Sequence, residues 1–229
     1  NLITGLPVAD YFDGSERNVD FINRKRDNLL KKKVRSLGST PTANISNVRV
    51  GCQAVAAWFD YVLNDDLEER NEVDGGVAIV DIGGRTTDIA VVQGGTSIDH
   101  AASGTENIGA LDVYTTVQSA LQKEFKIKDK FRLDILDQAV RNKTIRMWRK
   151  DFDISEIVEQ ATTLHGEKVK RAIERKLGSA ASLEAVVFVG GGAAMFPNLA
   201  AMFPNGEVAE DPEFSNAKGL LKFSRLQES

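Results

Sequence analysis

The chain of 229 residues is long enough to bury a sizeable core, and its 42% hydrophobic and 27% charged residues are typical of a globular protein. A net charge of −4 at pH 7 speaks against a protein that coats nucleic acid or an anionic membrane through its overall field. The single cysteine, Cys52, excludes an intrachain disulfide and a four-thiolate zinc site. Without a charged-then-apolar leader or an apolar run near the roughly 20 residues that span a bilayer, we expect a cytoplasmic protein with no membrane contact.

The first part of the chain predicts two strands and two helices. Residues 2–8 have the pattern of a strand that ends at Pro7, because proline removes a donor from the sheet. A basic helix follows, with Asn18 as its cap and Gly38 at its end. Four apolar side chains of this helix share one face: Ile22, Leu29, Leu30 and Val34.

The middle of the chain predicts a second strand and helix, then a strand pair. A short strand leads into a helix from about Gln53, which an acidic, polar stretch follows as far as Asp74. Residues 77–82 and 87–93 are two strands around a tight turn. After a loop over residues 103–109, apolar spacing predicts a helix whose buried side carries Leu111, Tyr114, Val117, Leu121 and Phe125.

The last part of the chain predicts one long helix and one further strand. Residues 127–150 are highly charged and lack a clear period, so we expect irregular structure there. A helix runs from about Ser155 to Leu177, and the apolar residues 183–189 form a strand. Three glycines follow, with Pro197 in the first turn of another helix, and residues 215–223 form a short helix.

The turn in "AIVDIGGRTTDIAVV", residues 78–92, carries residue types that bind phosphate. Gly83 and Gly84 have no Cβ, so their backbone N–H groups can approach an anion, and Arg85, Thr86 and Thr87 add further donors. Asp81 at the end of the strand can hold Mg²⁺, and Asp88 can orient the loop or the metal's water. The same residues also suit a plain hairpin bend, and the turn alone does not decide between the two interpretations.

A second glycine-rich turn lies in "VVFVGGGAAMFPNL". Gly190, Gly191 and Gly192 follow an apolar strand, so the backbone there can lie flat against a ligand such as adenosine. Neither a Walker loop nor the G-x-G-x-x-G dinucleotide pattern is present. Taken alone, this stretch fits a close-packed strand-to-helix turn better than a ligand site.

In this order, the two turns resemble the second phosphate loop and the adenosine loop of the actin and sugar-kinase superfamily. The segment "LPVADYFDGSERNVDFINRKRDNLLKKKV" is similar to the Leu-Pro, Tyr-aromatic-Asp and Arg-Lys-rich segment of the ParM (StbA) family of actin-like ATPases that segregate plasmids. The resemblance runs from Leu2 to about Leu221 and is weakest over residues 127–150.

The resemblance implies an α/β fold with two actin-like, ribonuclease H-like lobes, each a mixed five-stranded sheet flanked by helices. The first phosphate hairpin of the superfamily, Asp-x-Gly, is missing, so we expect a fragment that lacks the N-terminal part of the first lobe. The expected divisions are the rest of the first lobe (1–55), a helix and linker (56–75), the nucleotide-binding second lobe (76–205) and a C-terminal helix that returns to the first lobe (206–229).

The resemblance also implies the function of the whole protein, a slow ATPase that polymerises into filaments and segregates plasmid DNA. Gln53 matches the position that orients the attacking water, and Lys168 and Arg171 match positions that reach the ribose or base. The cofactors would be Mg²⁺ with ATP or ADP, or GTP instead. The partners would be other protomers and a ParR-like DNA-binding adaptor, without direct contact to nucleic acid.

Three alternatives stay open at this point. The basic run over residues 23–35 also suits a DNA site, although a solvated or protomer-contacting helix face explains it as well. A small-molecule kinase of the same superfamily would need a carboxylate base, for which the sequence offers no good candidate. A chaperone-like nucleotide-binding module would differ by not polymerising. The fragment by itself is expected to be inactive as an ATPase.

Overall fold

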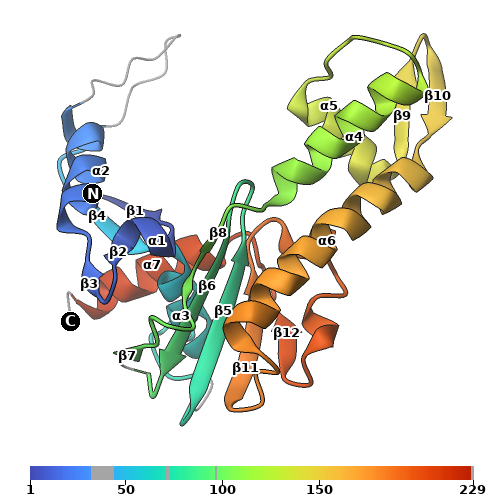
Figure 1. Ribbon diagram of the computed structural model, residues 1–229. Helices are drawn as coiled ribbons and strands as arrows, with labels where there is room; N and C mark the ends of the chain where they lie inside the picture. Colours follow the sequence, from blue (N-terminus) through green and yellow to red (C-terminus); the bar gives the residue numbers. More distant parts are fainter. Residues whose placement is uncertain (32–43, 71–72, 96, 228–229) are drawn as a thin grey trace.

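The centre of the protein is a mixed six-stranded sheet (Figure 1). The computed structural model describes residues 1–31, 44–70, 73–95 and 97–227. In the sheet, β12, β11 and β5 are parallel, whereas β6 runs antiparallel to β5 and pairs with both β7 and β8. The strands are β5 (Gly76–Ile82), β6 (Thr87–Gln93), β7 (Ser97–Ile98), β8 (Gly104–Glu106), β11 (Leu183–Val189) and β12 (Gly206–Val208).

The central strands are buried on both faces, and their alternation divides the core in two. Val80 and Ile82 of β5 point towards α4 (Ala110–Glu124) and α6 (Ser155–Leu177), whose apolar stripes cover one face. Val77 and Ile79, at the alternate positions of the same strand, point to the opposite face, which α3 (Gln53–Val62) covers. The expected α/β fold with a mixed sheet flanked by helices is therefore confirmed.

The N-terminal part is a parallel pair of strands with short helices. Strand β1 (Leu2–Leu6) pairs with β4 (Val48–Cys52), and α3 begins directly after β4, as the sequence predicts. Asn18 caps α2 (Val19–Lys31), because its Oδ1 accepts a hydrogen bond from the N–H of Phe21 at 3.2 Å. Val34 and Gly38, expected in the same helix, lie outside the described residues. The remaining elements here are α1 (Val8–Tyr11), β2 (Phe12–Asp13) and β3 (Glu16–Arg17).

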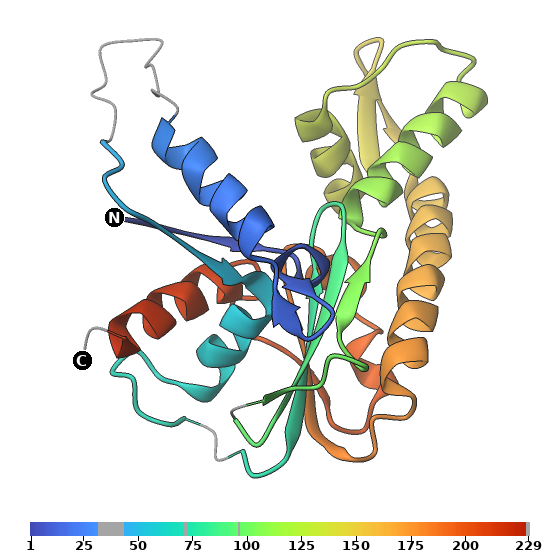
Figure 2. The ribbon, with the colours of Figure 1, turned by 60° about the vertical axis from the view of Figure 1, so that its left-hand side comes forward.

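Helix α7 (Ser215–Leu226) packs closely against α3, as the two views in Figures 1 and 2 show. The contact depends on a glycine, because a Cβ on Gly219 would lie 1.7 Å from the carbonyl oxygen of Ala56. One turn further on, the ammonium group of Lys222 is 2.7 Å from Asp60 Oδ1, and both residues are buried. The expected C-terminal helix is confirmed and extends three residues beyond the predicted range.

The region predicted as irregular is ordered, so that prediction was wrong. Residues 127–150 contain α5 (Leu133–Asn142), β9 (Thr144–Met147) and the first residue of β10 (Lys150–Asp153), and the two strands form an antiparallel hairpin. Together with the ends of α4 and α6, they project beyond the sheet (Figure 1). The two-residue turn of the hairpin is Trp148–Arg149, which carries none of the Asn-Gly or Asp-Gly signal that identifies such a turn in a sequence.

Two smaller expectations also failed. Residues 103–109, expected as a loop, contain β8, which is only three residues long and pairs with β6. Pro197 does not begin an α-helix: it follows η1 (Ala193–Met195) in a turn, and η2 (Ala200–Met202) comes after it. None of the described helices has the length and apolar character that a membrane crossing requires.

We expect Gly219→Val to destabilise the protein by about 3 kcal/mol or more, because the two helices would have to move apart to admit the side chain. Urea unfolding would measure the loss of free energy of unfolding. Ala217→Val is the matched control, since Ala217 is exposed in the same helix and should cost less than about 1 kcal/mol. Equal losses in the two variants would contradict the importance of the close approach.

Candidate functional site

Two aspartates face each other where the strands β5 and β6 meet their turn. Asp81 and Asp88 are directly opposed in the antiparallel register. Opposed residues have their Cβ atoms about 5 Å apart on the same face of the sheet. That face is the one that α3 covers, since Ile79 and Ala90, two residues from each aspartate, belong to the core beneath α3. The antiparallel register of the hairpin therefore brings two carboxylates together on the face of the sheet that α3 covers.

Both carboxylates are taken out of water, which changes their acidity. Asp81 is 4% exposed and Asp88 is 2% exposed. Burial raises the pKa of Asp81 to about 6, the hydrogen bond from Asn216 opposes this change, and the negative charge of Asp88 adds to it. Burial also raises the pKa of Asp88, against the hydrogen bonds that it accepts. A cation or a further hydrogen-bond donor placed here would stabilise the ionised carboxylates and so lower their pKa values again.

Asp88 connects the sheet to the N-terminal part of the chain. Its Oδ1 accepts hydrogen bonds from the N–H of Val8, at 2.9 Å, and from the hydroxyl of Thr105. Its Oδ2 accepts a longer bond of 3.3 Å from the hydroxyl of Thr86. Ala9 extends the junction by donating its N–H to Thr105 Oγ1 at 2.9 Å. Asp88 is thus largely occupied by the protein itself, whereas Asp81 has one described hydrogen-bond partner.

The glycine turn is fixed against the start of α4. The carbonyl groups of Gly83 and Gly84 accept hydrogen bonds of 3.0 and 2.8 Å from the first two N–H groups of the helix. Gly109 permits this approach, because a Cβ there would lie 2.5 Å from the carbonyl oxygen of Gly84. Asp112 completes the junction by accepting the N–H of Gly109 at 3.0 Å. The turn is therefore held in one conformation before any ligand arrives.

The donors predicted for phosphate are placed unequally on this turn. Arg85 is exposed and Thr86 is half-buried, so both side chains are near solvent at the bend. Thr87 is fully buried and its hydroxyl donates to the carbonyl of Ile108 at 2.9 Å. The Thr87 hydroxyl is accordingly engaged in the fold, and the Thr86 hydroxyl is engaged by its 3.3 Å bond to Asp88, so the unengaged side-chain donor at the bend is Arg85.

In the triple glycine, close neighbours exclude a side chain at the first and third residues, whereas the second residue has open space around it. A Cβ on Gly190 would lie 2.3 Å from Asp81 Oδ1, and a Cβ on Gly192 would lie 2.6 Å from Ile82 Cγ2. Gly190 also has a φ of +86°, which side chains rarely adopt. By contrast, a Cβ on Gly191 would meet nothing nearer than Glu213 Cβ at 4.0 Å. The flanking glycines let β11 pass close to Asp81, and the middle one leaves a flat, open backbone.

Asn216, which the sequence analysis did not identify, joins the site from α7. Its Nδ2 donates to Asp81 Oδ2 at 2.8 Å. Its Oδ1 is buried and has no hydrogen-bond partner among the described residues. Asn216 and Asp81 are 135 positions apart in the chain, and no local pattern marks an asparagine in the first turn of a helix as a partner. An unpaired buried acceptor beside a buried carboxylate is suited to a donor from a bound ligand or its water.

Gln53 is at the N-terminus of α3, directly after the strand β4. Its side chain crosses β1 where Gly5 leaves room, since a Cβ on Gly5 would lie 2.4 Å from Gln53 Cγ. The neighbouring Cys52 is buried, and its burial, with the charges of Asp88 and Asp81, raises the pKa of the thiol to about 12. The only cysteine of the chain is therefore a protonated core residue, and the polar group offered at this helix end is the amide of Gln53.

A cavity of about 610 Å³ opens along α6, close to the triple glycine in sequence. Lys168 and Arg171, predicted to reach a ribose or base, are exposed on α6 and do not line this cavity. The residues that line it from α6 follow a helical spacing, and others come from α4, from α5 and from the segment after the glycines. The lining includes Thr163, Gly166, Glu167, Lys170, Met195 and Phe196. The cavity thus lies along the same helix as Lys168 and Arg171, and other residues of that helix line it.

A metal ion would need ligands from outside the protein at this site. Among the described residues, no three His, Cys, Asp or Glu side chains converge so that they could hold a metal ion. Mg²⁺ is commonly carried by one or two carboxylates, with substrate phosphates and water completing its shell. The pair formed by Asp81 and Asp88 lies next to the glycine turn, so it fits a Mg²⁺ ion whose remaining ligands are phosphate oxygens and water.

Residues 79–201 match the family model described as archaeal actin homologue MreB-like, C-terminal. This range includes both aspartates, the glycine turn, the helices α4 and α6 and the triple glycine. No match is found among the curated proteins.

The fold is similar to those of solved actin-like proteins. A ParM filament from Clostridium botulinum is 21% identical with a TM-score of 0.80, covering 98% of this chain and 66% of its own. The archaeal actin homologue Ta0583 in complex with ADP is 22% identical with a TM-score of 0.66, covering 80% and 59%. Bacillus thuringiensis ParM with ATP is 14% identical with a TM-score of 0.61, covering 80% and 57%. The chain thus has an actin-like fold and spans about two thirds or less of these relatives.

We expect Asp81→Asn to stabilise the protein at pH 7 when no nucleotide or metal is present. The folded Asp81 keeps its proton up to about pH 6, whereas an unfolded one releases it near pH 4, so ionisation destabilises the folded state as the pH rises between these values. The gain should approach 3 kcal/mol at pH 7, at about 1.4 kcal/mol for each pKa unit.

Urea unfolding of Asp81→Asn and the unmodified protein at pH 4 and pH 7, in EDTA, would measure this gain. At pH 4 the advantage of the variant should fall to about 0.5 kcal/mol, because the carboxyl group is then protonated in the folded chain and only about half ionised in the unfolded chain. A gain that is the same at both pH values would show that burial of the charge is not its cause.

Proposed function

The chain belongs to the family of MreB-like archaeal actin homologues, and from this premise we propose that it carries the second-lobe half of a Mg²⁺-nucleotide site. One observation supports this most strongly. At the ends of β5 and β11, the buried Asp81 lies beside the open backbone of Gly191 and beside the unpaired Oδ1 of Asn216. A strand end that combines a carboxylate, a flat glycine and a free acceptor offers contacts to a metal's water, a sugar and a base.

In this proposal the phosphates lie at the turn between β5 and β6. The backbone N–H of Gly84 and the Arg85 guanidinium donate to phosphate oxygens, and the Thr86 hydroxyl does so by exchanging its 3.3 Å bond to Asp88 for one to the ligand. The turn needs no reorganisation to do so, because α4 already holds its carbonyl groups. Gly83 serves the geometry of the turn, since its N–H donates to the carbonyl of Thr86 at 2.8 Å. Thr87 positions the strand through Ile108.

Asp81 is the principal residue for Mg²⁺, with Asp88 beside it. When bound, the metal would neutralise charge on the phosphates and supply oriented water. Asp81 faces the site with one protein donor, and Asn216 holds its carboxylate in place. Asp88 orients Thr86 and ties α1 to the sheet. ATP and ADP are the expected nucleotides, with GTP as the alternative.

Gln53 is proposed to orient the water that attacks the terminal phosphate. Its amide can donate and accept at the N-terminus of α3, on the face of the sheet where Asp81 and Asp88 emerge. A glutamine orients water but does not remove its proton, so the hydrolysis is slow. The rest of the phosphate cage would come from the first lobe of the whole protein.

The base and ribose are proposed to lie over Gly191 and towards the cavity along α6. Glu167 and Lys170 line that cavity and can hydrogen-bond a base or ribose. Lys168 and Arg171 flank the cavity from the exposed side of the same helix. Met195 and Phe196 supply apolar contact for a planar base.

The whole protein is proposed to assemble into filaments in the cytoplasm and to segregate plasmid DNA through a ParR-like adaptor. The support is the similarity of the fold to a ParM filament protein. The chain spans 66% of that relative, so the function of the whole protein is a proposal. The proposed divisions of the chain are those expected from the sequence: 1–55 and 206–229 in the first lobe, 56–75 between the lobes and 76–205 in the second lobe. Light scattering by the whole protein with ATP and Mg²⁺ tests assembly. If no assembly is seen, the protein would instead be a nucleotide-binding module that does not polymerise.

We expect Gly191→Val to lower ADP affinity at least tenfold, because the branched side chain would occupy the open face over which the nucleoside is proposed to lie. A tenfold change corresponds to about 1.4 kcal/mol. Calorimetric titration with ADP and Mg²⁺ measures it. The melting temperature of the nucleotide-free variant is the control, and it should stay unchanged because the new Cβ has room. Unaltered affinity would mean that all three glycines serve packing.

We expect Asn216→Ala to reduce the gain in ADP affinity that Mg²⁺ provides, because Asp81 would lose its only described hydrogen-bond donor. The measurement is the ratio of ADP affinities in Mg²⁺ and in EDTA, which should fall about tenfold. Lys218→Ala is the control in the same helix, since Lys218 pairs with Asp211 and does not contact Asp81. A ratio that falls equally in both variants would point to a general disturbance of α7.

A further inference from the structure

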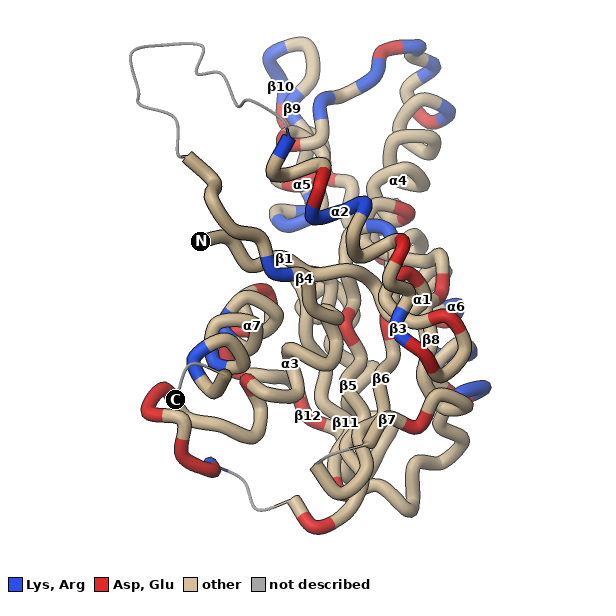
Figure 3. The backbone as a smooth tube through the Cα atoms, turned by 90° about the vertical axis from the view of Figure 1, so that its left-hand side faces the viewer, with Lys and Arg blue, Asp and Glu red and all other residues tan. Residues whose placement is uncertain are grey.

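The end of the molecule that projects beyond the sheet is basic and presents an aromatic side chain. We call residues 123–153 the distal tip. This segment has ten Lys or Arg and six Asp or Glu, so its net charge is about +4 in a chain whose total is −4. Figure 3 shows the Lys and Arg positions gathered over α4, α5 and the β9–β10 hairpin. The rest of the chain is accordingly strongly acidic, with a net charge of about −8.

Only a minority of the tip's cations are neutralised within the tip. Three of its arginines form ion pairs: Arg132 with Asp134, Arg141 with Asp137 and Arg146 with Asp151. For seven other cations, no ion pair appears anywhere in the described part of the chain: Lys123, Lys126, Lys128, Lys130, Lys143, Arg149 and Lys150. The tip therefore offers an excess of free positive charge to a partner.

Trp148 is at the end of the hairpin in a conformation that its residue type disfavours. Trp148 and Arg149 have φ values of +47° and +63°, the left-handed pair of a two-residue turn that Asn-Gly forms without strain. The indole packs edge-on against Phe152 and is still 64% exposed. A bulky aromatic residue held in a strained turn and left in water contributes little to the fold, which points to a role in binding.

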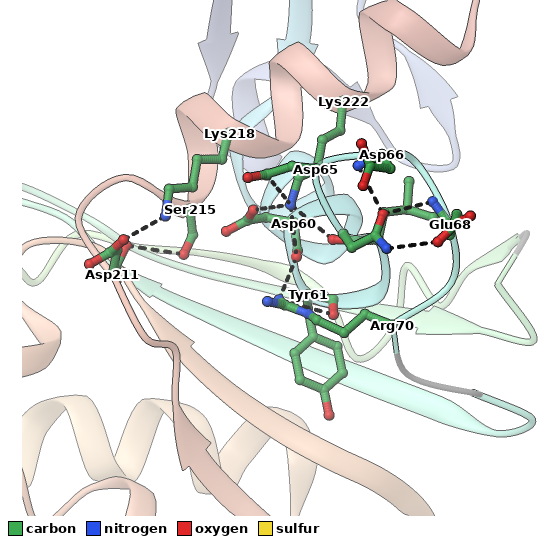
Figure 4. Close-up of polar contacts among 12 residues, drawn as sticks. Asp60, Tyr61, Asp65, Asp66, Glu68, Arg70, Asp211, Ser215, Lys218 and Lys222 are labelled. Carbon is green, nitrogen blue, oxygen red and sulfur yellow. Dashed lines mark hydrogen bonds and ion pairs between the residues drawn. The ribbon is translucent and has the colours of Figure 1, made fainter.

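The opposite end of the molecule has a cavity with acidic walls. This cavity, of about 540 Å³, lies between α3, β12 and α7, and we call it the acidic cavity. Its lining includes Asp60, Asp65, Glu207, Glu210 and Asp211. Asp66 and Glu68 follow Asp65 on the adjoining loop (Figure 4), and Glu69 comes next in the sequence. In Figures 1 and 3, the distal tip and this loop are at opposite ends of the molecule.

The cations of the acidic cavity are already engaged. Lys222 is bound to Asp60 at 2.7 Å and Lys218 to Asp211 at 2.6 Å. Arg70 donates to the carbonyl of Asp60 at 2.8 Å (Figure 4). Asp65 remains 95% exposed, with only a 3.7 Å contact to Lys222. Val208, on the wall of the cavity, is 44% exposed and offers apolar contact.

We propose that the distal tip of one copy of the chain docks into the acidic cavity of the next copy. Trp148 enters the cavity, and Arg149 and Lys150 pair with the exposed carboxylates around it. This docking rests on the proposed self-assembly, and the distal tip and the acidic cavity are the two surfaces that would meet in it. Because the surfaces differ and are at opposite ends, the contact is head-to-tail and leaves a free tip and a free cavity at the two ends of every chain of protomers.

A second copy explains the tip better than nucleic acid or an anionic membrane does. The partner must be concave to receive one indole, and acidic with some apolar surface around it; the acidic cavity meets each requirement. Opposite charge on the two surfaces also steers association and disfavours tip-to-tip contact. A membrane or a duplex would need a broader basic face, whereas the tip alternates its free cations with acidic residues over residues 123–153.

The test uses two variants of the 229-residue chain, each with one surface disabled. The tip variant is Trp148→Asn with Arg149→Gly, and the cavity variant is Asp65→Lys with Asp66→Lys. Sedimentation velocity at low salt should show each variant alone as a monomer and their equimolar mixture as a dimer, because only one working contact remains. The unmodified chain should form larger, concentration-dependent species that dissociate as salt is raised.

The tip variant separates binding from folding. Asn-Gly relieves the strain of the two-residue turn, so its melting temperature should equal or exceed that of the unmodified chain while its association is lost. Lys25→Glu is the charge-reversal control, because Lys25 is on α2 and in neither surface. It should associate like the unmodified chain.

Several results would overturn the proposal: a monomeric unmodified chain at every concentration, a tip variant that still assembles, or a mixture that stays monomeric. Binding of the unmodified chain to phosphatidylserine vesicles or duplex DNA, lost in the tip variant while association remains, would reassign the tip. ADP affinity, measured by calorimetry on the same samples, keeps the two proposals apart. Unchanged affinity without association would refute the docking alone, whereas no affinity in any sample would refute the nucleotide site.

Discussion

The close contact between α3 and α7 is the constraint on which the site depends. Gly219 lets the last helix of the chain lie directly against the backbone of Ala56, and the buried pair of Lys222 and Asp60 fixes the rotation of one helix on the other. A buried ion pair adds little net stability, but it strongly disfavours arrangements that leave either charge unpaired. With the helix set in this way, Asn216 in its first turn reaches Asp81, so the packing of two helices decides the geometry of a polar group at the strand end.

The site is made of parts that also hold the fold together. Gly190 and Gly192 are required for β11 to pass the end of β5, and Asp88 is occupied with joining α1 and β8 to the sheet. The groups left for a ligand are those that the fold does not use: the open face of Gly191, the free Oδ1 of Asn216 and the second lone pairs of Asp81. Burial makes the charged form of Asp81 unfavourable, so the same environment that destabilises the empty site favours binding of a cation.

The two ends of the molecule contrast in the way they treat charge. In the acidic cavity, Lys218 and Lys222 are each paired with a carboxylate, and the surplus is negative. At the distal tip the surplus is positive, and the strained turn keeps Trp148 in solvent. Neither arrangement is what stability alone would select, because an Asn-Gly turn and a balanced surface would cost less. Self-assembly through unlike surfaces gives both features one explanation.

The sequence by itself determined the elements whose periods are strong and local. The bounds of α6 and β11, the β5–β6 hairpin, the α3 start after Cys52 and the resemblance to actin-like proteins all follow from residue patterns within short windows, since hydrophobic alternation and capping act between near neighbours. Only the tertiary structure decided the rest. It ordered residues 127–150 through a turn without a turn signal, assigned the Thr87 hydroxyl to Ile108, and selected Glu167 and Lys170 for the cavity in place of Lys168 and Arg171. It also brought Asn216 to Asp81 across 135 positions. Such contacts are fixed by how distant elements pack, and no local window of the sequence contains both partners.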